Sequence, residues 1–362
     1  MNTRLIERIY EAALVPEHWR PLLHEIGAAI GAPAGQIFVF DDVRPVGFAA
    51  TDLVHEVTRA FCEGDMWRAS ERIPYIRSRP ITGFVLARQY FPPEMMARDD
   101  MAHALRAKGL EDQAGAAIAL PGGELAVLAF EKPGGERFTT TDLGRLNRHY
   151  AHLARAALMA ARLGLQEARS RVATLEELGL PACVLTASGQ ILAGNAGFEA
   201  MQNLFTPRAF GRLSLANPLA DKVMQQVLLA CQAGQEPLVR SIPVAASETH
   251  PGTILHVLPL RRTARDLFNS GDILLVASPV SASALVPSPT ILNGLFDLTP
   301  AESRLAAALA AGQTLGEAGA AQNLRPSTAR TYLDRILRKT GTHQQSQLVA
   351  LLKSAQSFPG RS

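Results

Sequence analysis

The chain has 362 residues, of which 47% are hydrophobic and 19% are charged, so it is long enough for two or three domains with apolar cores. A disordered chain is excluded, because that class has fewer apolar and more charged residues. The formal net charge of +3 is unevenly distributed: residues 290–362 contain eight Lys or Arg and four Asp or Glu, and the rest of the chain contains 28 and 29. A local positive excess of this kind suits contact with phosphate groups.

The three cysteines, Cys62, Cys183 and Cys231, are far apart and show no CxxC spacing, which argues against a disulfide framework and a structural zinc. The first residues do not show the charged segment followed by an apolar one that a signal peptide has. The longest apolar stretch, 151–165, is interrupted by Arg155 and Arg162, and falls short of the roughly 18–20 uninterrupted apolar residues of a membrane span. We therefore expect a cytoplasmic protein with no membrane contact, no metal and no cofactor.

The first 140 residues mix helical and strand patterns. Apolar residues at helical spacing predict helices over 3–14, 17–30, 53–61 and 99–108. Residues 36–40 predict a strand, and 114–120 and 125–130 predict two strands paired around Pro121-Gly-Gly. Aromatic residues in this region could line an apolar ligand pocket, although core packing is the default expectation for them: Trp19, Phe38, Phe40, Trp67, Tyr75 and Phe84. We predict a mixed α+β domain over 1–140.

A long helix is predicted over 141–178, with Thr139 in the segment that supplies its N-cap. Its apolar residues recur at alternating spacings of three and four: Leu143, Leu146, Tyr150, Leu153, Ala157 and Ala160. Such a stripe is typical of a dimerising coiled coil, and equally of a last helix packed on its own domain. We expect the first part to pack on the preceding domain and the second part to be a connector, with dimerisation left open.

A second α+β unit is predicted over 179–280, with a short helix containing Phe198 and strands at 182–186, 190–193, 238–244, 253–259 and 272–277. The segment 180–200, with its hairpin around Ser188-Gly189 and Asn195 before the helix, resembles the opening of a PAS domain. A linker is predicted over 281–294, because Pro, Ser and Ala dominate its first part.

Four short helices are predicted after the linker. Thr299, Pro300 and Glu302 form a capping-box pattern that begins the first, and Gly312 ends it. The second covers 315–322, a turn follows over 323–326, the third runs from Ser327 as its cap to residue 340, and the fourth covers 344–353. The outward positions of the third helix carry three arginines, one acid and a pair of hydroxyls near its start. This composition suits a helix inserted in the major groove of DNA.

These residues resemble the LuxR-type helix-turn-helix of bacterial transcription regulators. The matching runs follow one another in order and without gaps: 298–305, 311–312, 314–317, 328–333, 336–341 and 345–349. The resemblance implies a four-helix DNA-binding domain over 295–356, whose third helix reads DNA and whose fourth contributes to dimerisation. Four residues depart from the family's usual ones: Gly319, Gln322, Arg325 and Asp334.

The third helix supplies the candidate site residues. Base contacts are assigned to Arg330, Thr331 and Asp334. Phosphate contacts are assigned to Ser327, Thr328, Tyr332, Arg335, Arg338 and Lys339. Glu302 is expected to be structural, at the start of the first helix.

The region before the linker is expected to be sensory. Residues 142–156 resemble the helix that follows the GAF-like domain of such regulators, which implies a small-molecule or partner input. A phosphoacceptor receiver is disfavoured, because two helices precede the strand that ends at Asp41-Asp42. Flavin-adduct chemistry lacks a Cys after Asn195, and His250 and His256 are expected to be satisfied locally rather than to hold haem. No GxSxG, HExxH or GxGxxG motif is present, so we do not expect an enzyme.

The sequence therefore predicts a multidomain α+β transcriptional regulator, in which GAF-like and PAS-like sensor domains precede an all-α helix-turn-helix domain. The expected partners are double-stranded DNA, a second copy of the chain as a homodimer, a small-molecule effector and, in addition, RNA polymerase. Two alternatives stay open. One is a sigma-factor-like protein, which would need a helical region upstream, and the other is a sensor enzyme with a vestigial output domain.

Overall fold

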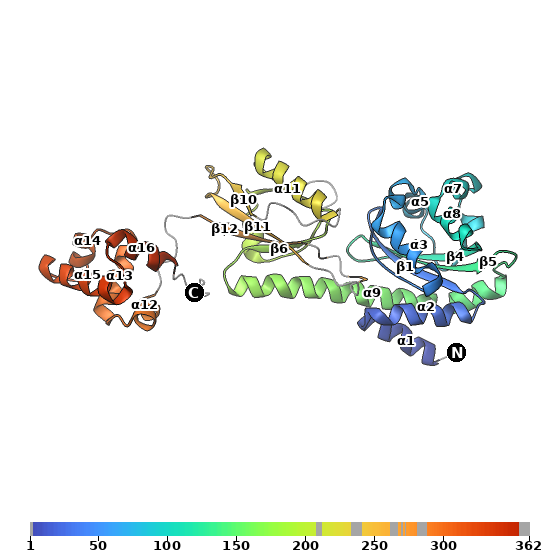
Figure 1. Ribbon diagram of the computed structural model, residues 1–362, viewed down its shortest axis with the longest axis horizontal. Coiled ribbons are helices and arrows are strands. Elements are labelled where there is room, and N and C mark those ends of the chain that lie inside the picture. The colour runs from blue at the N-terminus through green and yellow to red at the C-terminus, as the bar shows by residue number, and fades with distance from the viewer. Residues whose placement is uncertain are drawn as a thin grey trace.

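The computed structural model describes residues 3–207, 212–232, 241–260, 267–268, 271, 273–280 and 288–354. Within these residues the chain contains two five-stranded sheets and a C-terminal group of helices (Figure 1). The prediction of a mixed α+β protein is confirmed at this level. We refer to the three parts as the first, second and C-terminal units.

The first unit is built on the sheet β2-β1-β5-β4-β3, in which all neighbouring strands are antiparallel. Its strands are β1 (Ala34–Asp41), β2 (Arg44–Ala50), β3 (Val85–Leu86), β4 (Leu110–Ala119) and β5 (Leu125–Pro133). Its helices are α1 (Thr3–Leu14), the 3-10 turn η1 (Pro16–His18), α2 (Trp19–Ala28), α3 (Asp52–Glu63), α4 (Met66–Ala69), α5 (Arg72–Ser78), α6 (Ala87–Tyr90), α7 (Pro93–Arg98) and α8 (Asp100–Ala107).

Alternate residues of β1 face opposite sides of the first sheet, which gives the unit two apolar cores. Ile37 and Val39 pack with α1, α2 and the long helix α9 (Thr140–Glu177) on one face, and Phe38 and Phe40 pack with helices of the α3–α8 segment on the other (Figure 1). Helix α1 has the predicted bounds, because its apolar residues keep strict helical spacing. Strand β2 is not predicted by the sequence, since the run from Arg44 has no clear alternation of apolar and polar residues.

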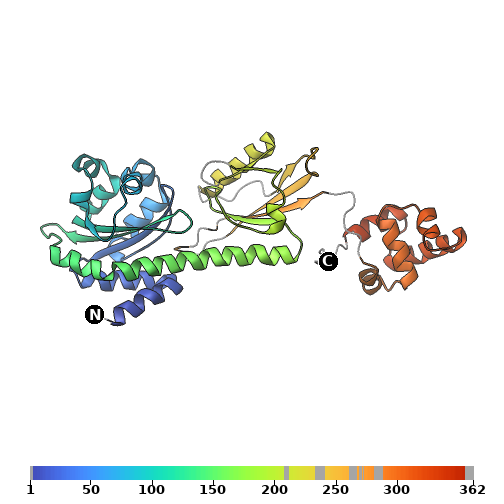
Figure 2. The same ribbon diagram turned by 180° about the vertical axis from the view of Figure 1, so that it is seen from behind.

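Helix α9 (Thr140–Glu177) is one helix of 38 residues that runs along both sheets (Figures 1 and 2). Leu146, Leu153 and Ala157 are buried in the core of the first unit. Ala168 and Val172 are buried against the second sheet. The first half therefore packs as expected. The second half, which the sequence predicts to be a connector, is also a packing surface for the second unit.

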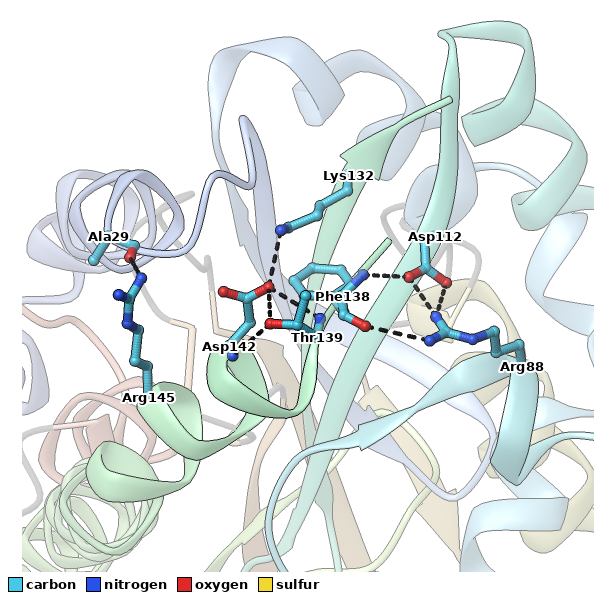
Figure 3. Close-up of polar contacts among 8 residues, drawn as sticks. All are labelled: Ala29, Arg88, Asp112, Lys132, Phe138, Thr139, Asp142 and Arg145. Carbon is cyan, nitrogen blue, oxygen red and sulfur yellow. Dashed lines mark hydrogen bonds and ion pairs between the residues drawn. The ribbon is translucent and has the colours of Figure 1, made fainter. Parts of the chain in front are cut away.

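Buried polar contacts fasten the start of α9 to the first sheet (Figure 3). Thr139 and Asp142 form a capping box, and Lys132 of β5 donates to the Asp142 carboxylate at 3.0 Å. Burial raises the pKa of Asp142, but hydrogen bonds from Thr139 and Lys132 outweigh this effect and lower the pKa overall. Asp112 of β4 accepts from the Phe138 N–H at 2.7 Å, just before the capping box. The position of α9 is thus set by two neighbouring strands.

The second unit is built on the antiparallel sheet β10-β11-β12-β6-β7. Its elements are β6 (Ala182–Leu185), β7 (Ile191–Gly194), α10 (Ala196–Glu199), the small pair β8 (Phe205–Pro207) and β9 (Leu213–Leu215), α11 (Pro218–Gln232), β10 (Ser241–Val244), β11 (Thr253–Pro259) and β12 (Ile273–Pro279). The predicted hairpin and the predicted strand 253–259 are confirmed. Of the strand predicted at 238–244, residues 238–240 lie outside the described residues.

Asn195 joins the second unit to α9. Its side chain caps α10 by accepting from the Phe198 N–H at 3.0 Å, and it accepts from the Ala182 N–H of β6 at 3.0 Å. Its amide group donates to the Val172 carbonyl of α9 at 3.1 Å and to the Leu180 carbonyl at 2.9 Å. One buried side chain therefore satisfies backbone groups of three elements, which explains an Asn at this position.

Two residues between β11 and β12 lie in the core of the first unit. Leu267 and Phe268 are 4% and 6% exposed and pack with α1, α2 and α9. The centre of the Phe268 ring lies 5.4 Å from that of the Trp19 ring. A Cβ added to Gly47 of β2 would stand 2.5 Å from the Leu267 carbonyl oxygen, so glycine permits this close approach. The first and second units are therefore joined at a second place besides α9.

The C-terminal unit consists of five helices around one apolar core: α12 (Pro289–Phe296), α13 (Pro300–Ala310), α14 (Leu315–Ala320), α15 (Pro326–Thr340) and α16 (Gln345–Ser354). The sequence predicts four of them, and α12 is the addition. Ser288 caps α12, and Asp297, with a φ of 51°, ends it. Leu292 of α12 is fully buried in the same core as Ile336 of α15, so residues predicted to be linker belong to this unit.

Candidate functional sites

Helix α15 carries all nine residues that the sequence assigns to DNA contacts. Its N-cap is Arg325 rather than the predicted Ser327, because Pro326 occupies the first helical position, where its missing N–H and fixed φ are favourable. Gly341 ends the helix in the left-handed conformation with a φ of 66°, as expected. The helix therefore begins earlier than predicted and ends where predicted.

Burial divides α15 into two faces. Ala329 and Ile336 are 2% and 0% exposed and lie on the inner face. Tyr332 and Thr328 are half-buried at the boundary between the faces. The exposed face carries the other seven assigned residues: Ser327, Arg330, Thr331, Asp334, Arg335, Arg338 and Lys339. Short and charged side chains near the start of this face suit base edges, and arginines further along suit phosphates.

Lys339 differs from its neighbours because its ammonium group already has partners within the protein. It donates at 2.8 Å to Glu302 Oε2 of α13 and at 2.8 Å to the Asp297 carbonyl. Glu302 also accepts from the Thr299 N–H at 2.8 Å, in the capping box predicted at this position. Burial raises the pKa of Glu302, but Lys339 and Thr299 together lower it. Lys339 thus holds α15 against α13, a role that its sequence position does not reveal.

Helix α14 and the turn after it allow α15 to approach closely. Thr314 and Glu317 form the second capping box of the C-terminal unit, which is not among the predictions from the sequence, with the Thr314 N–H donating to Glu317 at 2.8 Å. A Cβ added to Gly319 would stand 3.1 Å from the Ala329 Cβ of α15. Gly319, one of the departures from the LuxR-type pattern, therefore lies at a close helix contact. Asn323, with a φ of 56°, makes the turn between α14 and α15.

A cavity of about 430 Å³ lies on the first sheet, under helices α3, α5 and α8. Its lining is mostly apolar and includes four polar residues: Phe38, Phe40, Phe61, Ile73, Ile76, Met101, Val127, Ala129, and Gln36, Ser70, Arg72, Gln113. Two further spaces of about 320 Å³ each also border on Arg72 and Gln113. These volumes include space open to solvent, and the feature shared with small-molecule sites is the mostly apolar lining with a few polar groups. Of the aromatic pocket candidates, Phe38 and Phe40 line the cavity under α3, α5 and α8, whereas Trp19 and Phe84 pack on the opposite face of the sheet.

Glu131 of β5 lies at the polar end of this region. It is 1% exposed, and its Oε1 accepts from Gln36 Nε2 at 2.9 Å and from Gln113 Nε2 at 2.8 Å. These three residues come together because Gln113 pairs with Glu131 across β4 and β5, and Gln36 lies on β1 on the other side. Burial raises the pKa of Glu131 to about 7, against opposing contributions from Gln113, Arg72 and Gln36. Its Oε2 is buried and has no hydrogen-bond partner among the described residues.

Arg72 of α5 lines all three spaces and is held on two sides. One of its guanidinium nitrogens donates to the Gln113 amide oxygen, and the other lies 3.6 Å from Asp99. Asp99 in turn caps α8 and accepts from the Ser70 hydroxyl at 3.1 Å. The guanidinium also lies over the Phe91 ring, 4.9 Å from its centre. The sequence does not show that these residues meet, although polar residues inside apolar strands mark each strand separately.

The remaining candidates from the sequence have local partners. His256 contacts the Ser241 hydroxyl at 3.1 Å through Nδ1 and the Ser278 hydroxyl at 3.2 Å through Nε2. His250 Nδ1 lies 3.0 Å from the Pro251 carbonyl oxygen. Within the described part of the chain, no three His, Cys, Asp or Glu side chains are grouped as a metal site would require. No helix among the described residues is both long and apolar enough to cross a membrane.

No protein-family model and no curated protein matches the sequence. Among solved structures, the chain is similar to the N-acylhomoserine lactone-dependent LuxR-family transcription factor CepR2 from Burkholderia cenocepacia, with 17% identity and a TM-score of 0.36 over 45% of this chain and 97% of that one. It is similar to SdiA from Escherichia coli, with 12% identity and a TM-score of 0.29 over 90% and 86% of the two chains. It is also similar to the VqsR ligand-binding domain from Pseudomonas aeruginosa, with 12% identity and a TM-score of 0.37 over 44% and 96%. TM-scores of this size leave fold and function to be argued from the chain's own residues.

Proposed function

We propose that this protein is a LuxR-type transcriptional regulator. Its C-terminal unit binds double-stranded DNA through α15, and its first unit binds a small-molecule signal in the cavity beside Arg72. In this proposal the first unit is a GAF-like sensor, the second is PAS-like, and the chain is not an enzyme. It works as a homodimer, because each C-terminal unit reads one half of a two-fold DNA site. Its place is the bacterial cytoplasm, and RNA polymerase is a further partner.

The observation that carries DNA binding is the division of α15 into a buried face and a basic face. Ala329 and Ile336 fix the orientation of the helix in the core, so Arg330 and Thr331 lie together on the exposed side near its start. Arg335 and Arg338 follow on the same exposed side. A helix held in this way suits a protein that reads base edges with its first turns and binds phosphates with the later ones.

The experiment is selection of bound duplexes from random DNA with the full chain, followed by measurement of Kd on the selected site. We expect an inverted repeat whose half-sites are separated by about one helical turn of DNA or a multiple of it. Arg330→Ala should cost about 1–3 kcal/mol, which is roughly a 5- to 150-fold increase in Kd. Arg4→Ala, which removes an exposed arginine of α1, is the charge-matched control and should leave Kd unchanged.

Two outcomes would count against the proposal. Failure to enrich any DNA sequence would overturn DNA reading as the function, and an unchanged Kd for Arg330→Ala would overturn the assignment of α15. The sigma-factor alternative needs a helical region before the C-terminal unit, whereas the described residues there form two five-stranded sheets. No observation favours the enzyme alternative.

A further inference from the structure

The hydrogen bonds that surround Glu131 run in one direction. A guanidinium can only donate, so its bond to Gln113 requires the Gln113 oxygen to face Arg72 and the Gln113 NH2 to face Glu131. On the other side, the Thr58 hydroxyl donates to the Gln36 oxygen at 2.6 Å, and the Gln36 NH2 donates to Glu131. Two chains of donors therefore end on one carboxyl oxygen, Oε1. This arrangement suits the ionised form of Glu131.

The second oxygen of Glu131 is the unusual one. Oε2 is buried, and the residues that the structure describes provide it with no hydrogen-bond partner. Glu131 lines the space bordered by Leu105 and Leu110, which shares Arg72 and Gln113 with the cavity under α3, α5 and α8. Among the charged groups of this cluster, Arg72 lies 3.6 Å from Asp99, so one carboxylate already offsets its charge. In the same space, Asp112 is paired with Arg88, and Arg106 donates to the Met96 carbonyl, so neither arginine that lines this space forms an ion pair with Glu131 among the described residues.

The rest of the lining defines the other end of a ligand. Phe38, Phe61, Ile73 and Ile76 present aromatic and branched apolar surface to the cavity under α3, α5 and α8, whose empty volume of about 430 Å³ includes space open to solvent. A molecule that fills this region gains most when it is apolar at one end and supplies a cationic hydrogen-bond donor to Glu131 at the other. A buried charge is tolerated only when it is paired. A ligand with an apolar body alone would therefore leave Glu131 Oε2 without a hydrogen-bond donor or a counter-charge.

We infer that the signal is an ammonium compound, in which a protonated amine pairs with Glu131 and an aromatic or branched apolar body lies among Phe38, Phe61 and Ile76. This inference rests on the proposed function, in which the cavity holds the signal. An ammonium group both neutralises the carboxylate and donates to Oε2. A hydroxyl group only donates, and a ligand carboxylate would place a second negative charge beside Glu131.

The test uses three probes of nearly equal size and shape: 2-phenylethylamine, 2-phenylethanol and phenylacetate. Their Kd values for the full chain are measured by calorimetry at pH 8, without DNA. Three variants are compared with the natural chain. Glu131→Gln removes the charge and keeps the shape, Ile73→Trp fills the cavity, and Glu7→Gln removes an exposed carboxylate of α1 as the matched control. Thermal unfolding of each variant checks that it is folded.

We expect the amine to bind roughly tenfold or more tightly than the alcohol, and the carboxylate to bind most weakly. Glu131→Gln should weaken amine binding by at least that factor and change alcohol binding by less than about threefold. Ile73→Trp should abolish binding of all three probes, and Glu7→Gln should change none. Tightest binding by phenylacetate, equal amine affinity in Glu131→Gln, or no binding by any probe would overturn the inference. Because no DNA is present, these results are separate from those of the DNA selection. Enrichment of a DNA site without amine binding leaves the proposed regulator intact and overturns the ammonium ligand. Amine binding without enrichment of any DNA site overturns only DNA reading.

Discussion

Glu131→Gln is expected to change how the stability of the first unit depends on pH. The pKa of this carboxyl group rises from its ordinary 4.5 to about 7 in the folded chain, because the group is buried. Between these two values the folded state holds a proton that the unfolded state has released, so the free energy of unfolding falls as pH rises. One pKa unit corresponds to about 1.4 kcal/mol, so the loss across this range is about 3 kcal/mol. Below pH 4.5 and above pH 7, Glu131 makes no contribution to the slope of the free energy of unfolding against pH.

The assay is urea unfolding of the full chain and the variant at a series of pH values from 4 to 9. Fluorescence reports the first unit, because both tryptophans of the chain, Trp19 and Trp67, lie in it. Other ionisable groups contribute equally to both proteins, so the difference between the two curves isolates Glu131. We expect the variant to gain stability relative to the natural chain by about 3 kcal/mol between pH 4.5 and 7, and then to keep that advantage. Parallel curves would refute the reasoning.

Three further variants test contacts made elsewhere. Phe268→Ala removes a ring buried in the core of the first unit and should lower the free energy of unfolding by about 3–5 kcal/mol in the same assay. Gly47→Val drives β2 against the Leu267 carbonyl and should cost about 1–3 kcal/mol, again by urea unfolding. Lys339→Met leaves the buried Glu302 carboxylate without its cation, so the melting temperature should fall while the salt dependence of DNA binding stays the same.

Each of these has a matched control in the chain. Leu258→Ala, at a position 45% exposed, should cost less than about 1 kcal/mol, and a cost equal to that of Phe268→Ala would contradict the packing of Phe268. Gly144→Ala adds a Cβ where nothing lies within 4 Å and should be tolerated, unlike the change at Gly47. Arg338→Met should reduce the slope of log Kd against log salt by about 1. The same reduction for Lys339→Met would show that Lys339 binds phosphate.

The sequence predicts best those elements that carry a strong local pattern. Helix α1 and strand β11 have the predicted bounds, because α1 keeps its apolar residues at helical spacing and β11 is a short run of mostly apolar and β-branched residues that begins after a glycine. Helix α12 is missed for the opposite reason. It has eight residues, follows a segment rich in Pro, Ser and Ala, and owes the burial of Leu292 to packing with other helices of its unit. Short helices of this kind are stabilised by tertiary contacts rather than by local pattern.

The two candidate sites also differ in how far the sequence predicts them. The exposed face of α15 follows from the spacing of Ala329 and Ile336, and its DNA contacts stay a prediction from that pattern and the family resemblance. The polar cluster of the first unit could not be predicted, because Gln36, Gln113 and Glu131 lie on three different strands. They come together only through the strand order β1-β5-β4 and its register, and neither is visible in the local sequence.

The contact of Leu267 and Phe268 with the first unit has a consequence for the order of folding during synthesis. Once the ribosome has completed α9 at Glu177, about 90 further residues must be added before Phe268 is synthesised, which takes roughly 5–20 s at about 5–20 residues per second. Throughout this interval the apolar surface around Trp19 lacks part of its cover. The first unit therefore cannot complete its core as an autonomous early product. A fragment that ends with α9 should bind hydrophobic dyes and aggregate more readily than the full chain.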